Sequence, residues 1–158
     1  MLAQKFLFLL VLILAPGALW SQQDPLLRLG GTWQQNFAKS TPVPTPLPRS
    51  RIHIYEPAGK DRMKHTSEEI DANGEKTVNE GIDTYDGKEH PDDSARADTV
   101  LHRRVDSYTT QQIMSKDGKI VRFLERVVSP DGRTLTIRQI GADAQGRAVI
   151  SIGTYKKQ

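Results

Sequence analysis

The sequence contains no cysteine. This absence excludes disulfide bridges, thiolate metal sites and cysteine nucleophiles. A chain of 158 residues is long enough to bury a core without such cross-links, even in an oxidising compartment. All of its stability must therefore come from packing and hydrogen bonding.

The sequence also lacks the motifs on which enzymes and cofactor-binding proteins are usually recognised. Most of its glycines occur singly, so there is no glycine-rich phosphate loop, and no Gly-x-Ser-x-Gly elbow is present. Adjacent carboxylates such as Glu68 and Glu69 would point to opposite faces of a strand. We therefore expect no enzyme, no catalytic residue and no cofactor.

Metal-binding patterns are missing as well. The four histidines are not spaced by two or four residues, and we interpret each as a surface or edge residue: His53, His65, His90 and His102. Asp71, Asn73 and Glu75 alternate as in a calcium loop, but Gly74 comes too early, so a hairpin turn is the better interpretation. The acidic segment 92–94 is interpreted as a solvated loop. No metal ligand is predicted.

Charge of one sign does not accumulate. The formal net charge is +3, and lysine, arginine, aspartate and glutamate are interspersed along the chain. A nucleic-acid-binding face needs clustered positive charge. Nucleic acid is therefore not expected as a partner, and nothing identifies a protein partner.

The N-terminal segment is the longest apolar run of the chain. Lys5 precedes the unbroken run Phe6–Ala15, which Pro16 and Gly17 end. The run is about half the length of the roughly 20 residues that cross a bilayer. Its order is that of a cleavable signal peptide, a signal helix over residues 1–21. We expect export to the periplasm or the medium, with no stable membrane anchor after cleavage.

Residues 22–158 are predicted to form a single all-β domain, because no sustained helical period follows the leader. Asp24 and Pro25 favour one helical turn that packs three leucines inward: Leu26, Leu27 and Leu29. A first strand should span 31–37. Four prolines make 41–48 an extended connector.

Short glycine turns separate the remaining segments and predict antiparallel hairpins. These turns are at 71–74, 86–87, 116–118, 130–132 and 144–146. The β-branched segments 119–129, 133–140 and 148–156 should form a meander, preceded by a pair at 98–105 and 107–114. The resulting eight or nine strands predict an antiparallel up-and-down barrel or strongly curved meander, with a sandwich as the alternative.

The segment between Lys60 and Ala97 has few large apolar residues. If Met63 faces inward, His65 shares its face; if Val78 and Ile82 face inward, so does Glu80. The segment is therefore either a solvent-exposed flap, which is the simpler interpretation, or one wall of a partly polar interior.

Gly31-Thr32-Trp33 opens the first predicted strand and resembles the Gly-x-Trp signature of lipocalins and related calycin barrels. In those barrels, the tryptophan closes one end and an arginine near the last strands stacks on it. The resemblance implies this role for Arg138, with Arg147 as the alternative.

A longer resemblance covers nearly all of residues 22–158. The opening GTWxxNxxKS pattern at 31–40 is similar to that of a family of small exported bacterial proteins, and turn motifs at 55–59, 85–91, 116–119 and 127–132 continue it. Glu89-His90 departs from the acid–aromatic pair usual before the proline. The resemblance implies a lipocalin-like barrel in the envelope or outside the cell, and no reaction.

A barrel of this size can enclose one small ligand. We expect a small hydrophobic or amphipathic ligand, lined by apolar residues with polar exceptions such as His65 or Glu80: Ile52, Ile54, Val78, Ile82, Phe123, Leu135 and Ile137. The alternative is an envelope structural or protein-interaction module in which the same residues fill a solid core.

Overall fold

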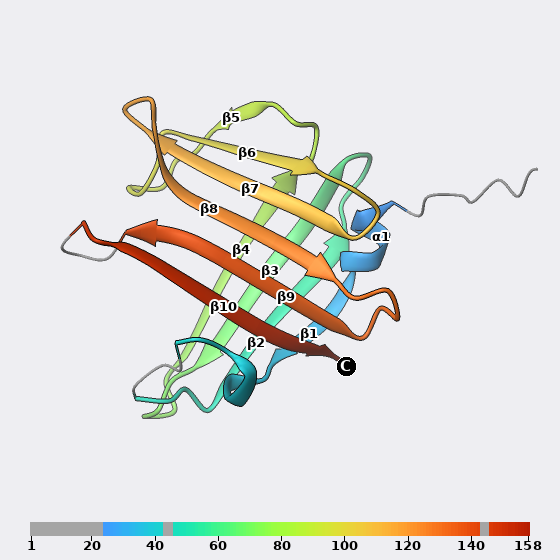
Figure 1. Cartoon of the computed structure of the whole chain (residues 1–158), viewed down its shortest axis with the longest axis vertical. Coiled ribbons are helices and arrows are strands. Elements are labelled where there is room, and N and C mark those ends of the chain that lie inside the picture. The colour runs from blue at the N-terminus through green and yellow to red at the C-terminus, as the bar shows by residue number, and fades with distance from the viewer. Residues whose placement is uncertain (1–23, 43–45, 143–145) are drawn as a thin grey trace, which may run out of the picture.

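The computed structural model describes residues 24–42, 46–142 and 146–158 (Figure 1). Its elements are α1 (Pro25–Leu29), β1 (Gly31–Gln35), the 3-10 turn η1 (Phe37–Lys39), β2 (Ser50–Pro57), β3 (Arg62–Ile70), β4 (Lys76–Thr84), β5 (Glu89–Pro91), β6 (Thr99–Arg104), β7 (Thr109–Lys116), β8 (Lys119–Val128), β9 (Thr134–Ala142) and β10 (Ala148–Lys157). The predicted signal peptide, residues 1–21, and positions 43–45 of the proline-rich connector lie outside the described residues. Within them, no helix is long and apolar enough to cross a membrane.

All ten strands join one antiparallel sheet in the order β4-β3-β2-β1-β10-β9-β8-β7-β6-β5. The predicted all-β curved meander is confirmed, including the three-stranded unit β8-β9-β10 and the preceding pair β6-β7. β1 pairs with both β2 and β10, and so links the first strands of the chain to the last. The structure has more strands than predicted because Glu89–Pro91 adds a short edge strand.

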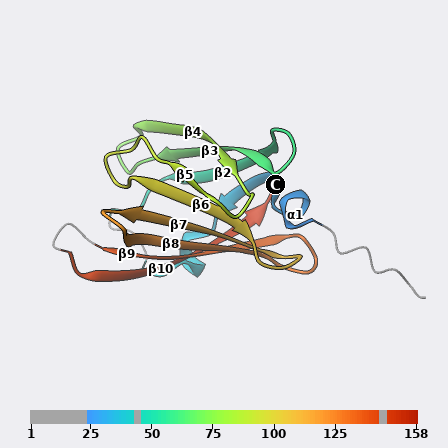
Figure 2. The same cartoon turned by 90° about the horizontal axis from the view of Figure 1, so that it is seen from above.

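The sheet folds over on itself without closing completely. Figure 2 shows β2, β3 and β4 lying across from β6 to β10, with α1 at one end. The edge strands β4 and β5 are not hydrogen-bonded to each other. The predicted hairpin at 86–87 is therefore wrong: this turn carries the chain across the opening between the two edges.

The segment 62–84 is not a flap. β3 and β4 pair over their whole length, from Arg62 opposite Thr84 to Ile70 opposite Lys76. The turn between them is the predicted Asn-Gly hairpin, in which Asp71 Oδ1 accepts hydrogen bonds from the backbone N–H groups of Gly74 and Glu75, both at 2.8 Å. The flap interpretation is wrong, and the segment instead forms one wall of the barrel.

The end of the barrel beside α1 is filled with apolar side chains. Asp24 Oδ1 caps the helical turn by accepting from the Leu26 N–H at 2.9 Å. Leu26 and Leu29 are buried as predicted, whereas Leu27 is 61% exposed, because one short turn cannot direct three neighbouring leucines to the same side. Beneath the turn lie the largest buried side chains: Trp33, Tyr55, Met63, Tyr85, Val128 and Leu135.

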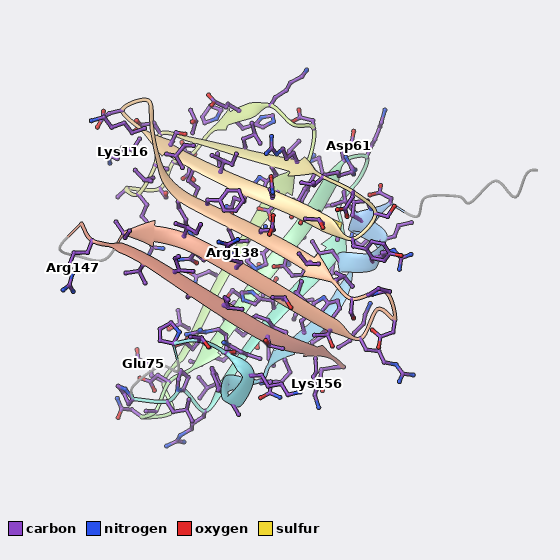
Figure 3. All side chains as sticks on the ribbon, viewed as in Figure 1. Asp61, Glu75, Lys116, Arg138, Arg147 and Lys156 are labelled. Carbon is purple, nitrogen blue, oxygen red and sulfur yellow. The ribbon has the colours of Figure 1, made fainter. Side chains whose placement is uncertain are left out.

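Trp33 closes this end, but its cation is not the expected arginine. The indole Nε1 donates to the carbonyl of Leu29 at 2.7 Å, and the Lys157 ammonium lies 5.0 Å from the ring centroid. Arg138 is exposed on β9, where it is paired with Ile152 of β10. Figure 3 shows Arg138 in the middle of the sheet. Arg147 lies beyond it, at the opposite end of the barrel from α1. The role predicted for these arginines is therefore wrong, because β10 brings Lys157 opposite Trp33.

Candidate functional site

The half of the barrel away from α1 contains a cavity of about 580 Å³. Its lining surface is about equally apolar and polar, and the apolar part comes mainly from Leu124, Ile137, Ile152 and the rings of Tyr55 and Tyr155. Most of the lining residues are nevertheless polar or charged: Gln35, Ser40, Thr41, Arg51, His53, His65, Ser67, Asp83, Gln112, Arg122, Arg126, Gln139 and Ser151. The barrel thus changes along its axis from an apolar core to a cavity of mixed lining.

Strand alternation explains how polar residues come to face inward. On β2, Arg51, His53 and Tyr55 line the cavity, so the intervening Ile52 and Ile54 must lie on the outer face. Our prediction that these isoleucines line a ligand site is therefore wrong. Tyr55 decides the orientation, because its large ring is fully buried against the core.

The other predicted lining residues divide into three groups. Ile137 and His65 line the cavity, as predicted, whereas Leu135 is fully buried in the core. Four predicted residues lie on the outer face instead: Val78 at 46% exposure, Ile82 at 52%, Glu80 and Phe123. Glu80 forms an ion pair with Lys64 at 3.1 Å and accepts from the Thr66 hydroxyl at 3.0 Å, which accounts for its position away from the interior.

Arg126 on β8 is the most deeply buried cation of the site, at 4% exposure. Its Nε donates to the Tyr55 hydroxyl at 3.0 Å, and its Nη2 donates to Gln112 Oε1 at 3.3 Å. The third nitrogen, Nη1, is buried without a hydrogen-bond partner among the described residues. A guanidinium remains protonated even when buried, so this N–H is an unpaired charged donor on a residue that lines the cavity.

Arg122, four residues earlier on the same face of β8, repeats this arrangement. Its Nη2 donates to Gln139 Oε1 at 2.6 Å, while its buried Nε has no partner among the described residues. Burial, and then the positive charge of Arg126, lowers the pKa of Arg122. Arg51, by contrast, is neutralised by Glu69 at 2.6 Å. Two guanidinium groups are therefore left without a carboxylate in contact within the described part of the chain.

Imidazole and phenol rings form the wall contributed by β2 and β3. His53 Nδ1 and His65 Nε2 lie 3.0 Å apart, and the rings are stacked at 5.2 Å between centroids. The Tyr55 ring is stacked on His65, with 4.9 Å between the ring centroids. Burial lowers the pKa of His53 to about 3 and that of His65 to about 4, with nearby cations adding to the effect. Both imidazoles are therefore neutral at pH 7.

A third inward histidine, His102 on β6, lies deeper in the barrel and is 4% exposed. Its Nε2 is 3.4 Å from Asp83 Oδ1. Burial lowers the pKa of His102 to about 4, although Asp83 opposes the shift. The interpretation of the histidines as surface or edge residues is thus wrong for His53, His65 and His102, and holds for His90 on the edge strand β5. No group of three potential metal ligands occurs in the described segments.

Comparison with known proteins supports the fold. Neither a family model nor a curated protein sequence matches the chain. Solved structures do match: the fluorescent protein UnaG has a TM-score of 0.60 at 14% identity, covering 84% of this chain and 99% of its own. The fatty-acid-binding protein 1 of Echinococcus granulosus gives a TM-score of 0.55 at 18% identity, covering 83% of this chain and 98% of its own. The fold is therefore similar to that of fatty-acid-binding proteins.

Sequence reasoning missed most of the site because β2 and β8 offer two mixed faces. On β8, the outer face carries Phe123 and Val127, while the inner face carries Arg122, Leu124 and Arg126. Hydrophobicity alone favours the wrong face. The sequence signal that could have identified the inner face of β2 is Tyr55, which shares a face with Arg51 and His53. A large ring with a polar tip is typical of a boundary between an apolar core and a polar cavity.

Proposed function

We propose that this barrel binds a small organic anion with an apolar part, held inside by Arg122 and Arg126. Such a ligand falls within the amphipathic class expected from the sequence. The binding of fatty acid by the Echinococcus granulosus protein lends support by analogy of fold. The arginines supply the more direct argument, because they belong to this chain.

One observation carries the proposal: Arg126 Nη1 is a buried, charged donor with no partner among the described residues. Leaving such a donor unpaired costs roughly 1–3 kcal/mol, and more for a charged group. A carboxylate accepts from two guanidinium N–H groups at once and removes that penalty. The nearby Arg122 Nε offers a second donor of the same kind.

The charge balance of the cavity favours an anion over a cation. Glu69 neutralises Arg51, and Asp83 is the remaining carboxylate among the described lining residues. Arg122 and Arg126 therefore leave the cavity with excess positive charge. Its volume of about 580 Å³ lies within the range of small-molecule sites. The apolar part of the ligand would contact Leu124 and Ile137.

The alternative of a structural module depends on a filled interior, and the cavity weighs against it. We further propose that the barrel catalyses no reaction. We also propose that it acts in the periplasm or the medium, after export. The neutral imidazoles of His53 and His65 stack on Tyr55 and on each other. Among the described residues, neither imidazole is hydrogen-bonded to a serine that it could activate as a nucleophile. The sequence of the leader, rather than the fold, supports export.

The test is calorimetric titration with dodecanoate and with its methyl ester, which has the same chain without the charge. We expect dodecanoate to bind and the ester to bind at least about tenfold more weakly, as one charged hydrogen bond requires. Replacing Arg122→Gln should weaken dodecanoate binding by a similar factor and leave ester binding unchanged.

Arg103→Gln provides the matched control, because Arg103 is exposed on the outer face of β6, where it donates to Gln111. This variant should bind dodecanoate as the unaltered protein does. Equal affinity for the acid and the ester, or no binding of either, would contradict the proposal. Circular dichroism of each variant separates lost binding from lost folding.

A further inference from the structure

Strand β4 is an open edge of the sheet. It pairs with β3 along one side, from Lys76 opposite Ile70 to Thr84 opposite Arg62, and no other strand of the described chain is hydrogen-bonded to it. Among the described residues, its backbone forms no hydrogen bond outside this pairing. Alternate N–H and C=O groups along its nine residues are therefore left for water or for another strand.

The opposite edge of the sheet, β5, is protected from such pairing, whereas β4 is not. β5 has three residues and ends in Pro91, which has no N–H to donate. β4 has no proline and no bulge, and its outer face exposes Val78 at 46% and Ile82 at 52%. A long, regular and partly apolar edge of this kind is a template for pairing with another chain.

The beginning of β4 is the part that an incoming strand can reach. At the C-terminal end of β4, Asp83 Oδ1 lies 3.4 Å from His102 Nε2 on β6, and just beyond it the Gly87 N–H donates to the His102 carbonyl at 3.0 Å. Figure 1 shows that β4 and β6 separate toward the start of β4. Residues 76–82 are exposed throughout. A strand that pairs with β4 must therefore lie along its first residues.

The outer face of this part of β4 carries a self-complementary pattern of charge. Lys76 pairs with Glu68 of β3 at 2.9 Å, and Glu80 pairs with Lys64 of β3 at 3.1 Å. Lys76 and Glu80 lie on the same face, on either side of Val78. When a second copy of the chain lies antiparallel along β4 with Val78 opposite Val78, each Lys76 lies directly opposite Glu80 of the other copy.

We propose that two copies of this chain associate through their β4 strands, antiparallel and related by a two-fold axis at Val78. The two sheets then continue into one another, and the free backbone groups of residues 76–80 pair across the axis. On the outer face, charges of alternating sign cross four strands in the order Glu68, Lys76, Glu80, Lys64, the last two from the second copy. The symmetry of the interface repeats this row once more.

Charge and access both favour this register over longer ones. Pairing all nine residues would place the axis at Glu80 and bring two carboxylates opposite each other, which is destabilising. It would also require the end of β4 that lies against β6. An axis at Asn79 would place Lys76 opposite Ile82, without a facing charge. Because the favoured pairing is short, we expect a weak dimer with a dissociation constant on the order of 10–100 µM.

The test is sedimentation velocity of the purified full chain at concentrations from about 5 to 500 µM, which should show monomer giving way to dimer. Lys76→Glu and Glu80→Lys each convert two facing attractions into two repulsions and should weaken association at least about tenfold. An equimolar mixture of these two variants should restore it. In the mixed dimer, the two substituted side chains face each other with opposite charge, and so do the two original ones.

Arg138→Glu is the matched control, because Arg138 is exposed on the outer face of β9, a strand that is paired on both sides. This variant should dimerise as the unaltered protein does. Hydrogen exchange at the backbone amides of residues 76–80 should slow as the concentration of the unaltered protein rises. Circular dichroism checks that each variant folds. If a charge variant does not fold, Val78→Lys takes its place, since it brings two cations together at the axis.

Three results would overturn the proposal. The first is a chain that stays monomeric at the highest concentration, which would leave the β4 edge to an extended segment of a different protein. The second is association that persists in both single variants, which would place the contact on another surface. The third is a mixture that fails to dimerise when the unaltered protein does, which would exclude the register at Val78. None of these results depends on the ligand of the barrel.

Discussion

Arg126 on β8 donates a hydrogen bond from its Nε to the hydroxyl of Tyr55 on β2, at 3.0 Å. The two residues are 71 positions apart in the chain and lie on opposite walls of the folded sheet. Both are buried, and the Arg126 guanidinium lies 5.7 Å from the centroid of the Tyr55 ring. This contact joins the walls at the level where the apolar core ends and the polar cavity begins.

Tyr55→Phe should destabilise the fold by about 1–3 kcal/mol, because it leaves the Arg126 Nε buried without its acceptor while the ring is kept. Urea denaturation followed by circular dichroism measures the change. Tyr108→Phe is the matched control: Tyr108 is only half-buried, and its ring lies against the side chain of Arg28. Equal stability losses in the two variants would show that the hydrogen bond between the walls contributes nothing.

Lys157→Met should destabilise the end beside α1 by about 0.5–1 kcal/mol, because it removes the cation beside the Trp33 ring and keeps a side chain of similar length. Arg138→Met introduces the same residue on the outer face and should change stability by less than about 0.5 kcal/mol. Thermal unfolding of both variants measures the difference. The reverse order would show that the cation beside Trp33 does not stabilise this end of the barrel.

Most of the strands could be predicted from the sequence, because turn chemistry and β-branched residues act locally. The glycine turns at 116–118 and 130–132 lie where the hairpins β7-β8 and β8-β9 turn, and β8, β9 and β10 begin and end within two residues of the predicted positions. The turn at 86–87 has the same local chemistry but joins strands that do not pair. Which strands become edges depends on the closure of the whole sheet, which no local pattern contains.

The site could be predicted only in part, because the usual rule that apolar residues face inward is reversed in the half of the barrel that holds the cavity. On β2, Ile52 and Ile54 lie outside while Arg51 and His53 lie inside. Hydrophobic patterning chose the wrong face here and was correct at Ile137, where the strand runs from the cavity into the core. A polar interior becomes recognisable only when its charged groups are seen to pair across strands.

Gly153→Ala should weaken ligand binding by crowding the cavity. A Cβ at this position would lie 2.7 Å from Cε2 of Tyr155, whose ring is folded over Gly153 on the same face of β10. The Tyr155 ring, which lines the cavity, must then move from its present position. We expect dodecanoate affinity to fall about tenfold or more, with a stability loss of about 1–3 kcal/mol from overpacking.

The control for this steric effect is Gly81→Ala on β4, where an added Cβ has no described atom within 4 Å. It should bind dodecanoate normally and change stability by no more than about 0.5 kcal/mol. Calorimetric titration of the two variants decides the matter. Unchanged affinity in Gly153→Ala would mean that Tyr155 does not border the bound ligand.

Acidification should destabilise the barrel well above the pH at which carboxylates titrate. The pKa values of His53, His65 and His102 lie at about 3, 4 and 4 in the fold, below their ordinary value of 6.5. Between pH 6.5 and those values, the unfolded chain binds protons that the folded chain excludes. The free energy of unfolding is therefore largest above pH 6.5 and falls as the pH is lowered.

The expected loss between pH 6.5 and 5 is about 1–2 kcal/mol for each histidine, since a pKa shift of one unit corresponds to about 1.4 kcal/mol. Urea unfolding midpoints at pH 7, 6 and 5 measure it. The double variant His53→Phe/His65→Phe should flatten most of the slope, whereas His90→Gln should retain it because His90 is exposed on β5. A slope that the double variant leaves intact would place the protonation elsewhere, because burial of two neutral imidazoles predicts that both contribute to it.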